Sequence, residues 1–510
     1  MSTGGENSDS TNASPREALT MRPTKALNIV LAMHREEGHC NASFGLAKYL
    51  RECGHMVTYL GLMDARKLVV EQGFEFVPFA EDILPEGALR ESANLPAGST
   101  PKPLRSWQRR LANERLFRAF LRRLSNGHLD QRLLSCQPDV LVCDTCVWYV
   151  ALRAISLGIP TVNLSPFLAG YPNPHIPPFH YSRVPHSSWW GRMQVRADWL
   201  RLRCQFVFTR RLASILFGKW RSPTRMHTLT GEFLRLARRS GVPSKENRNY
   251  WFTETGPRMI LPEIFLAPKS FDFPHTPGSN QVYLADFIDL RRTEDATLLE
   301  QLDPKKPLVY CSLGSASRYY PHSSHFFQTV VAASRQRKDW QWVLSVGTQQ
   351  KVDQFGEPGS NLLIVQWAPQ LSMLQRAAAM VTHGGINSIV EGIHFSVPML
   401  IVPGLRDQPG NAARAVYHGI AVTARMKDLT AGQLVSLIEK AMHNPDLRKA
   451  MSGMQARMEA ESGMAAAAEL IEAAGRIGPG GGSGSRRNGS SGPVKETTQP
   501  WSVSSGGVDR

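Results

Sequence analysis

The chain has 510 residues, of which 42% are hydrophobic and 20% are charged, which is enough to bury the cores of two domains. It contains no run of about eighteen or more apolar residues, and its polar N-terminus lacks the apolar segment of a secretory signal. These features argue against a typical spanning helix or signal peptide. The seven cysteines are scattered and odd in number, which argues against a disulfide framework. We therefore expect a cytoplasmic protein.

The formal charge of +16 raises the question of an anionic partner. Much of this charge lies in residues 102–123 and 183–225, where arginines alternate with Trp, Leu and Phe. Solvated arginine faces on packed helices are one interpretation, and peripheral contact with the inner, anionic face of a membrane is another. Nucleic acid ranks third, because no recognised DNA or RNA motif accompanies the charge. We therefore expect no nucleic-acid partner.

The N-terminal half of the chain alternates predicted strands and helices. Residues 1–24 are rich in Ser, Thr, Asn and Gly and predict a disordered tail. Residues 25–285 then show the alternation of an α/β domain with a parallel sheet. The predicted strands are residues 27–33, 56–61, 74–78, 139–144, 158–163, 258–261 and 281–284, and the predicted helices are residues 42–51, 65–72 and 149–157.

Two irregular stretches interrupt this alternation. Residues from about 81 to 130 are irregular and then basic and helical, which predicts an insertion that shapes a binding pocket. Residues 166–182 are dense in Pro, His and aromatic residues, which predicts a fixed, nonhelical loop of the kind that lines binding sites. Cys143 and Cys146 form a CxxC, but no second pair or histidine stands at zinc spacing nearby. We interpret both cysteines as part of a buried strand and the turn after it.

A second α/β domain follows. Residues 286–300 are interpreted as a linker, residues 301–477 as the second domain, and the Gly/Ser-rich residues 478–510 as a flexible, disordered tail. The second domain begins from Pro307 with the strand LVYCSLGS, whose Ser312, Gly314 and Ser315 end in a strand-to-helix turn. That turn either contacts phosphate or is a plain strand-to-helix turn. Two doubly wound, Rossmann-like domains are therefore predicted.

The most informative stretch is residues 363–411, in which apolar strands, helices, a Gly-rich turn and a polar loop follow one another as consecutive βαβ units. Such units build parallel sheets, and their ligands bind beyond the carboxyl ends of the strands. The residues that directly follow each apolar run are therefore the candidates for ligand binding.

The sequence HGGINS follows one of these strands and precedes a helix. Gly384 and Gly385 let the backbone approach a ligand closely, and His383 adds a side-chain donor. Asn387 and Ser388 suit the start of a helix, whose free N–H groups and dipole attract anions. The pattern predicts a phosphate site, although two glycines alone also fit an ordinary tight loop.

Neighbouring residues extend the predicted site beyond phosphate. Trp367 follows a strand and suits stacking on a planar base, with the Gln370 amide beside it for bonds to the base edge. Glu391, one helical turn after the Asn-Ser pair, suits bonds from sugar hydroxyls. Asp407 and Gln408 follow the next strand, where they suit either sugar hydroxyls or an ordinary solvated turn.

These residues carry a resemblance to a known family. The ordered series WAPQ, THGGxNSxxE, PxxxxP and DQxxNA resembles the donor-binding signature of the family 1, GT-B fold, UDP-dependent glycosyltransferases. The resemblance implies that Trp367 stacks on uracil and that Gln370 and Glu391 contact the base and ribose. Plant members carry a tryptophan where this chain has Ile386, so the chain is closer to bacterial and macrolide-type relatives.

The resemblance also implies roles for the remaining candidates. His383, Asn387 and Ser388 match positions that hold the diphosphate, where the two glycines also contribute. Asp407 and Gln408 match positions that bind the hexose, which favours UDP-glucose as donor. No metal ligands are expected, because no carboxylate cluster stands at the spacing of a divalent-ion site and the GT-B fold needs none.

Glycosyl transfer needs a base that takes the proton of the acceptor hydroxyl. His39 is expected on the first strand-to-helix loop, and the ordinary pKa of a histidine, near 6.5, suits this task. Asp144 ends a later strand and could bond the other ring nitrogen, as the acid of a triad does. Both residues match the family's catalytic positions, whereas His34 does not.

The sequence therefore predicts an inverting glycosyltransferase that moves a hexose from a UDP-sugar to a hydroxyl of a small, lipophilic acceptor such as a carotenoid, sterol, lipid or polyketide. No cofactor is expected beyond the donor substrate. Three alternatives stay open: a catalytically silent UDP-sugar-binding protein, a basic protein that binds nucleic acid or membrane, and a GT-B sugar epimerase that needs no acceptor.

Overall fold

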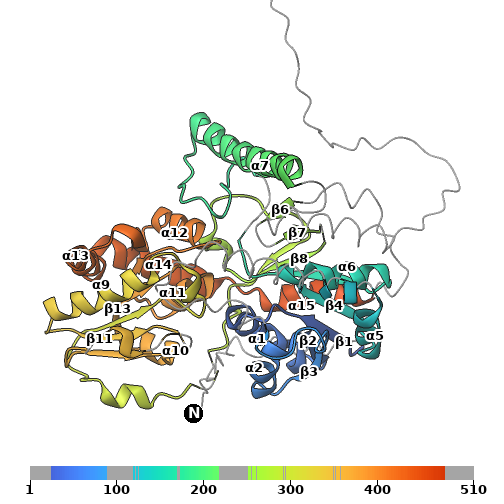
Figure 1. The fold of residues 1–510 in the computed structure, drawn as a ribbon, viewed down its shortest axis with the longest axis horizontal. Coiled ribbons are helices and arrows are strands. Elements are labelled where there is room, and N and C mark those ends of the chain that lie inside the picture. Colours follow the sequence, from blue (N-terminus) through green and yellow to red (C-terminus); the bar gives the residue numbers. More distant parts are fainter. Residues whose placement is uncertain are drawn as a thin grey trace, which may run out of the picture.

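The computed structural model describes residues 25–88, 116–168, 173–217, 251–290, 292–347 and 350–476, with short gaps at 117–118, 121, 125, 254–255, 260, 293, 351 and 356–357. Within these residues the chain forms two α/β domains, each built on a parallel sheet, which lie side by side (Figure 1). The two tails predicted at residues 1–24 and 478–510 lie outside the described residues, as do most of the basic residues 102–123.

The N-terminal domain contains a seven-stranded sheet with the order β3-β2-β1-β4-β5-β8-β9. Every strand pair in it is parallel. Its strands are β1 Asn28–Ala32, β2 Met56–Gly61, β3 Glu75–Pro78, β4 Val140–Asp144, β5 Thr161–Ser165, β8 Glu263–Phe265 and β9 Gln281–Tyr283. Its helices are α1 Glu37–Glu52, α2 Arg66–Glu71, α5 His128–Ser135, α6 Trp148–Ser156 and α7 Trp189–Phe217.

The C-terminal domain contains a six-stranded parallel sheet with the order β12-β11-β10-β13-β14-β15. Its strands are β10 Leu308–Ser312, β11 Gln341–Ser345, β12 Leu362–Val365, β13 Ala377–Thr382, β14 Met399–Ile401 and β15 Ala421–Thr423. Its helices are α9 Ser323–Gln336, α10 Gln370–Leu374, α11 Ile386–His394, α12 Gln408–Tyr417, α13 Ala431–His443, α14 Pro445–Ala460 and α15 Met464–Arg476.

Short 3₁₀ turns join several of these elements. They are η1 Met63–Ala65, η2 Thr145–Val147, η4 Lys269–Phe271, η5 Thr297–Gln301, η6 Ser317–Tyr319, η7 Val352–Phe355 and η8 Met426–Asp428. A separate antiparallel pair, β6 Trp251–Thr253 with β7 Gly256–Arg258, lies outside both sheets. The strand predicted at residues 258–261 is therefore displaced, because β7 ends at Arg258 and the sheet strand β8 begins only at Glu263.

The central strands are buried throughout and mostly apolar because helices cover both of their faces. Every residue of β4, β5, β10 and β11 is buried. Near-continuous apolar runs of this kind are what the sequence showed at these positions. The predicted doubly wound fold is confirmed for both domains.

The last helix that the structure describes, α15, returns to the first domain. Helix α15 contacts β4, β5 and β9 of the N-terminal sheet. Glu472 on this helix lies 3.2 Å from His55, and a side chain added at Gly475 would contact Leu27. The boundaries inferred from the sequence place residues 301–477 in one domain. Helix α15 nevertheless packs on the N-terminal sheet and so joins the two domains, and no sequence motif pointed to this contact.

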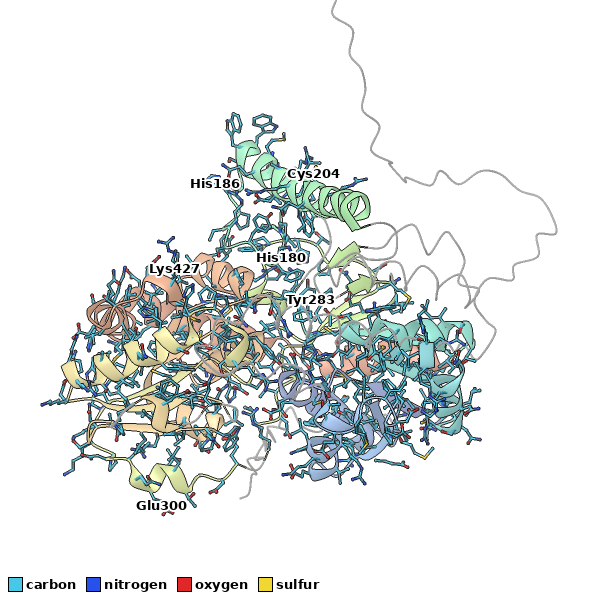
Figure 2. The ribbon with its side chains drawn as sticks, viewed as in Figure 1. His180, His186, Cys204, Tyr283, Glu300 and Lys427 are labelled. Carbon is cyan, nitrogen blue, oxygen red and sulfur yellow. The ribbon has the colours of Figure 1, made fainter. Side chains whose placement is uncertain are left out.

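Helix α7 is the longest helix among the described residues, and it projects from the body of the two domains (Figures 1 and 2). It accounts for the first part of the basic segment predicted to be helical, and residues 218–225 of that segment lie outside the described residues. Among the helices that the structure describes, none combines enough length and apolarity to cross a bilayer.

Candidate functional site

Strand pairing assembles the candidate site in the N-terminal domain. Strands β1 and β4 are parallel neighbours, with Ala32 opposite Cys143 at their carboxyl ends. The residue that ends β4, Asp144, therefore lies beside the segment that follows β1, which carries His39. Residues that are distant in the sequence meet here because neighbouring parallel strands end at the same sheet edge.

The same rule assembles the site in the C-terminal domain. Ser312 at the end of β10 lies opposite Thr382 at the end of β13, and Thr382 lies opposite Ile401 of β14. The turns that follow these strands, which carry Gly314, His383 and Asp407, therefore gather at one edge.

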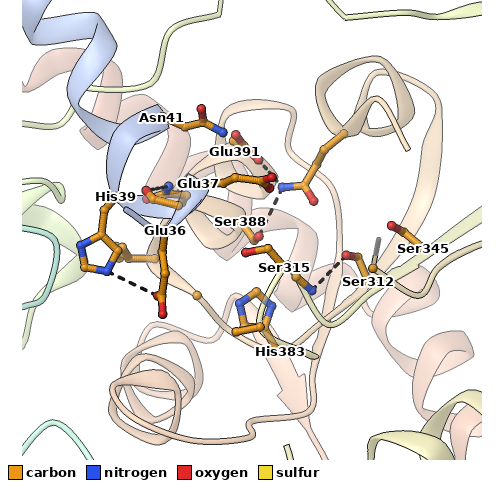
Figure 3. Close-up of a pocket in the computed structure, with 18 of the residues that line it drawn as sticks. Glu36, Glu37, His39, Asn41, Ser312, Ser315, Ser345, His383, Ser388 and Glu391 are labelled. Carbon is orange, nitrogen blue, oxygen red and sulfur yellow. Dashed lines mark hydrogen bonds and ion pairs between the residues drawn. The ribbon is translucent and has the colours of Figure 1, made fainter. Parts of the chain in front are cut away.

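A cavity of about 440 Å³ lies between the two edges. Figure 3 shows Glu36 and His39 from the N-terminal domain on one side of it and Ser312, His383 and Ser388 from the C-terminal domain on the other. Most of the site residues predicted from the sequence line this cavity: His39, Ser312, Gly314, Trp367, Gln370, His383, Gly385, Asn387, Ser388, Glu391, Asp407 and Gln408. Asp144 and Gly384 lie behind the lining.

His39 and Asp144 form a buried pair. The Nδ1 atom of His39 lies 2.6 Å from Oδ2 of Asp144, and Asp144 is completely buried. The backbone N–H groups of His34 and Cys146 donate to the same carboxylate, at 3.1 Å and 2.8 Å. Asp144 is thus held in place by backbone donors, and it fixes the imidazole with Nε2 as the remaining nitrogen.

The electrostatics of this pair suit a base. Burial lowers the pKa of His39, but the charge and hydrogen bond of Asp144 outweigh burial, so that the pKa lies above its usual value. Burial raises the pKa of Asp144, but the nearby imidazole outweighs it and holds this pKa below its usual value. The neighbouring His34 has its pKa lowered to about 4 by burial and stays neutral.

The local structure around His39 differs from the prediction. The sequence placed His39 on a loop and began the helix near residue 42, whereas α1 begins at Glu37 and carries His39 in its first turn. The reason is that nothing in this segment stops the helix from starting early. It contains no proline, and its one glycine, Gly38, lies in the first turn with open space around it, where glycine is tolerated. His39 is consequently held by a helix.

Two side chains connect the domains beside His39: Arg406, which the sequence did not single out, and Asn387, which it assigned to the phosphate site. Arg406 donates two hydrogen bonds to Glu36, at 2.7 Å and 3.0 Å. Asn387 donates from Nδ2 to the carbonyl of Gly38 at 2.8 Å. The start of α1 is therefore bonded to the C-terminal domain at two points. Only the position of Arg406 directly before the Asp-Gln pair hinted at its importance.

The glycines of the predicted phosphate site make room for a histidine. A Cβ atom at Gly385 would lie 2.6 Å from Nε2 of His383, and one at Gly314 would lie 2.8 Å from its Cε1. Gly314 and Gly384 also have positive φ angles of 71° and 85°. Burial lowers the pKa of His383 to about 4, so the imidazole is neutral and offers one N–H donor.

Helix α11 begins at Ile386, with Gly385 as its N-cap and no side chain capping it. Its first turn therefore has no N-cap side chain to bond its free N–H groups, and Ile386, Asn387 and Ser388 of that turn line the cavity. Asn387 and Ser388, expected at the start of the helix, lie within its first turn, and Ser388 accepts a hydrogen bond from Gln370 at 3.2 Å. Ser312 accepts from the N–H of Gly314 at 3.2 Å and orders the first turn of this domain.

Of the residues predicted to bind the base, Trp367 is exposed and the side-chain amide of Gln370 is held by hydrogen bonds. The side chain of Trp367 lines the cavity, and the residue is 51% exposed, unusually high for an indole. Gln370 donates to Glu391 and accepts from the hydroxyl of Tyr310 at 3.2 Å. Glu391 also accepts from Arg292 at 2.7 Å, a residue of the predicted linker that the sequence reasoning did not single out.

The predicted hexose-binding pair is buried and serves partly to shape its own loop. Gln408 accepts from the N–H groups of Gly404 and Leu405 at 2.8 Å and 3.0 Å and donates to Tyr320 at 2.6 Å. Asp407 accepts from Asn411 at 2.7 Å, and burial raises its pKa. Both residues line the cavity, but the side-chain amide of Gln408 already makes its hydrogen bonds within the protein.

Two groups of side chains have atoms close enough to approach one metal ion among the described residues: His34, Glu36 and His39, and His39, Asp144 and Cys146. In the first group Glu36 is paired with Arg406, and in the second group the Nδ1 atom of His39 is paired with Asp144. That the reaction needs no metal stays a prediction.

Comparison with known proteins agrees with this geometry. The family model described as "UDP-glucoronosyl and UDP-glucosyl transferase" matches residues 257–455. This matched segment, less than half of the chain, is similar to the UDP-glycosyltransferase family. It is 25% identical over 442 residues to zeaxanthin glucosyltransferase from Pantoea ananas, covering 85% of this chain and 93% of that protein. The family resemblance drawn from the sequence is confirmed.

A second relative matches a shorter segment. NDP-glycosyltransferase YjiC from Bacillus licheniformis is 32% identical over 171 residues, which are 34% of this chain and 42% of YjiC. This match spans less than half the length of that relative.

Solved structures of the same fold cover almost the whole chain. The calicheamicin glycosyltransferase CalG4 has a TM-score of 0.59 at 20% identity, covering 89% of this chain and 100% of CalG4. The glycosyltransferase VinC in complex with dTDP has a TM-score of 0.57 at 20% identity, covering 88% of this chain and 99% of VinC. The predicted GT-B fold is confirmed.

Proposed function

We propose that this protein transfers a hexose, with glucose as the first candidate, from a UDP-sugar to a hydroxyl group of a small lipophilic acceptor, with inversion at the anomeric carbon. The proposal rests on the observation that residues of the two domains form two facing walls of one cavity. The buried His39–Asp144 pair lies on one wall, and the turns of the family's nucleotide-sugar motifs lie on the other.

The reaction follows from Nε2 of His39, which lies 3.9 Å from a carboxylate oxygen of Glu36 and is not used by Asp144. Because Nδ1 is engaged by Asp144, Nε2 takes the proton of the acceptor hydroxyl as the oxygen attacks the anomeric carbon. The bond between that carbon and the diphosphate oxygen breaks, and UDP leaves with the electron pair. Asp144 stabilises the imidazolium that forms. Attack opposite the leaving group converts an α-linked donor into a β-glycoside.

The leaving diphosphate is stabilised by the C-terminal wall. The N–H groups at the start of α11, the backbone at Gly384 and Gly385, and the neutral imidazole of His383 provide donors. In this proposal Trp367 stacks on uracil, Gln370 and Glu391 bind the base edge and ribose, and Asp407 with Gln408 contacts the hexose. The mechanism uses protein donors and no metal ion.

The acceptor wall supports a lipophilic substrate. Phe167 lines the cavity, stacks on Phe179 with ring centroids 6.1 Å apart, and packs edge-on against His39 at 5.7 Å. An apolar acceptor body would lie against these rings with its hydroxyl at the imidazole. The named activity of the Pantoea relative, a zeaxanthin glucosyltransferase, makes a hydroxylated carotenoid a reasonable first probe. The proposal places the protein in the cytoplasm, in peripheral contact with the inner face of a membrane.

The test is product formation from UDP-glucose with a panel of hydroxylated carotenoids, sterols and polyketides, analysed by mass spectrometry and by the anomeric proton coupling of the product. A β-glucoside that forms in wild type and disappears in His39→Ala supports the proposal. Conversion of the UDP-sugar without any acceptor would instead identify an epimerase. UDP binding without product under every acceptor would identify a silent binding protein.

A further inference from the structure

Helix α7 has an unusual distribution of apolar side chains. Over residues 189–205 its inward face buries Val195, Asp198 and Trp199. Its outward face exposes Trp189 (57%) and Leu200 (60%), which lie nearly in line along the helix. Among the described residues no other helix exposes as many large apolar side chains; those on α7 are Trp189, Trp190, Met193 and Leu200.

Arginines flank this apolar stripe on both sides. At 100° per residue, Arg196 and Arg203 fall on one side of the line through Trp189 and Leu200, and Arg201 falls on the other. All three are exposed. The one acid in residues 189–205, Asp198, faces inward, where Arg183 donates to it. The outward face therefore carries positive charge around an apolar centre.

The inward contacts hold the helix in a fixed orientation. The indole N–H of Trp199 donates to the carbonyl of Ile176 at 2.8 Å. A Cβ atom at Gly191 would lie 2.1 Å from the carbonyl oxygen of His186, so the preceding loop crosses the helix in close contact. Cys204, labelled in Figure 2, lies farther along the same helix, which projects from the two sheets.

We propose that the outward face of α7, defined by Trp189, Trp190, Met193, Leu200 and the surrounding arginines, docks on the surface of an anionic lipid bilayer. A polar face rich in arginine with exposed tryptophan and leucine is the composition of helices that lie in the interface of a membrane. Indole rings favour the headgroup level of a bilayer, where the N–H group can contact water while the rest of the ring contacts the apolar chains. Arginine stems cover the apolar margin while their charges meet the lipid phosphates.

A second copy of this chain fits this face less well. Two such faces packed together would bring their arginines close to one another without an acidic residue between them, and like charges repel. Single-stranded nucleic acid would use the arginines and the indoles, but it would leave the aliphatic centre at Leu200 and Met193 without a partner. An anionic bilayer satisfies both the charge and the apolar stripe.

The docking surface is connected to the cavity through contacts. Trp199 on the inward face bonds the loop at Ile176, and Phe179 of the same loop stacks on Phe167, which packs against His39. Through these contacts the docking face of α7 could serve the reaction: a lipophilic acceptor would pass from the bilayer along the loop that carries Ile176 and Phe179 toward the imidazole of His39. That use rests on the proposed glycosyl transfer, whereas docking itself only gives the membrane contact named with that proposal a defined surface.

The experiment is co-sedimentation of the full-length protein with unilamellar vesicles of phosphatidylcholine, with or without phosphatidylglycerol, at low and at high salt. We expect binding only to the anionic vesicles and mainly at low salt. The double variant Trp190→Ser/Leu200→Ser should bind at least tenfold more weakly. The variant Arg196→Gln/Arg201→Gln should lose about fivefold for each arginine removed.

Met56→Ser is the matched control, because Met56 is 62% exposed on strand β2, away from α7, and this variant should bind as wild type does. Equal vesicle binding by wild type and the α7 variants would overturn the proposal, and so would the absence of binding. Dimers that dissociate in the Trp190/Leu200 variant, seen by analytical ultracentrifugation, or displacement of vesicles by an oligonucleotide, would also overturn it. If vesicles bind as expected but UDP fails to stabilise the wild type, the proposed function falls and the docking surface remains.

Discussion

The two walls of the cavity are built in different ways. The C-terminal wall comes from consecutive βαβ units, so that the residues from Trp367 to Gln408 lie close together in the chain as well as in space. The N-terminal wall joins His39 to Asp144 across 105 positions, through the pairing of β1 with β4. The first wall is therefore organised by local sequence and the second by sheet topology, and we expect mutations to separate donor binding from chemistry along this division.

The largest effect should come from His39→Ala. Loss of the base should lower kcat by about 10²–10⁴-fold, because general base catalysis typically contributes that much. The Michaelis constant for the UDP-sugar should change little, since His39 belongs to the wall opposite the nucleotide motifs. Steady-state kinetics with the best acceptor measures both constants. Full activity in this variant would remove the base assignment.

The pH profile gives the next prediction. The base must be neutral to accept a proton, so kcat/KM falls as pH drops through the pKa of His39. Because Asp144 raises this pKa, the acid limb for wild type should lie above pH 6.5. In Asp144→Asn the charge that opposes the burial of His39 most strongly is lost and only Glu36 still raises the pKa, so the limb should move to lower pH while the rate at its plateau drops. A limb that stays in place would show that another group titrates.

Trp367→Ala tests the opposite wall. Stacking on a base is worth about 1–3 kcal/mol, which corresponds to roughly 5- to 150-fold weaker donor binding. We expect this increase in the Michaelis constant for the UDP-sugar, with kcat at saturation nearly unchanged. Trp190→Ala is the matched control, because this tryptophan is 70% exposed on α7 and does not line the cavity. An equal effect of both substitutions would mean that Trp367 does not bind the donor.

The smallest effect should come from the link between the walls. Arg406 and Glu36 form an ion pair whose side chains are 40% and 23% exposed, so their coupling should be about 0.2–1 kcal/mol of unfolding free energy. A double-mutant cycle with Glu36→Gln and Arg406→Gln measures it by chemical denaturation. The exposed pair Lys67–Glu71 within α2 serves as control and should give at most half that coupling. Coupling below that of the control would mean that the pair does not hold the domains together.

The features that could be predicted from the sequence are those that depend on local sequence pattern or on the order of the strands. The turn at His383–Gly385 and Trp367, which we propose bind phosphate and base, could be placed at the sheet edge because apolar strands, glycines and a helix follow each other directly. His39 and Asp144 needed the family resemblance, since no local pattern joins them. The helical placement of His39 and the start of α11 at Ile386 were missed because helix ends depend on small differences in free energy.

Contacts between the domains were beyond reach of the sequence. Glu36 and Arg406 are separated by 370 positions and pair only because both domains present them at one cavity. Arg292 lies in a segment read as a linker, yet it bonds Glu391. Helix α15, at the end of the chain, packs on the first sheet. Such contacts depend on the relative placement of two folded domains, which periodicity and turn chemistry do not encode.

The measurement that tests the central claim most directly is the thermal stabilisation of wild type, His39→Ala and Trp367→Ala by UDP, with UDP-glucose, dTDP and ADP alongside. A ligand that binds only the native state raises the melting temperature according to its affinity. The two-wall account predicts that UDP or UDP-glucose stabilises wild type and His39→Ala equally and loses most of its effect on Trp367→Ala. Absence of stabilisation in wild type, or its loss in His39→Ala with retention in Trp367→Ala, would contradict the account.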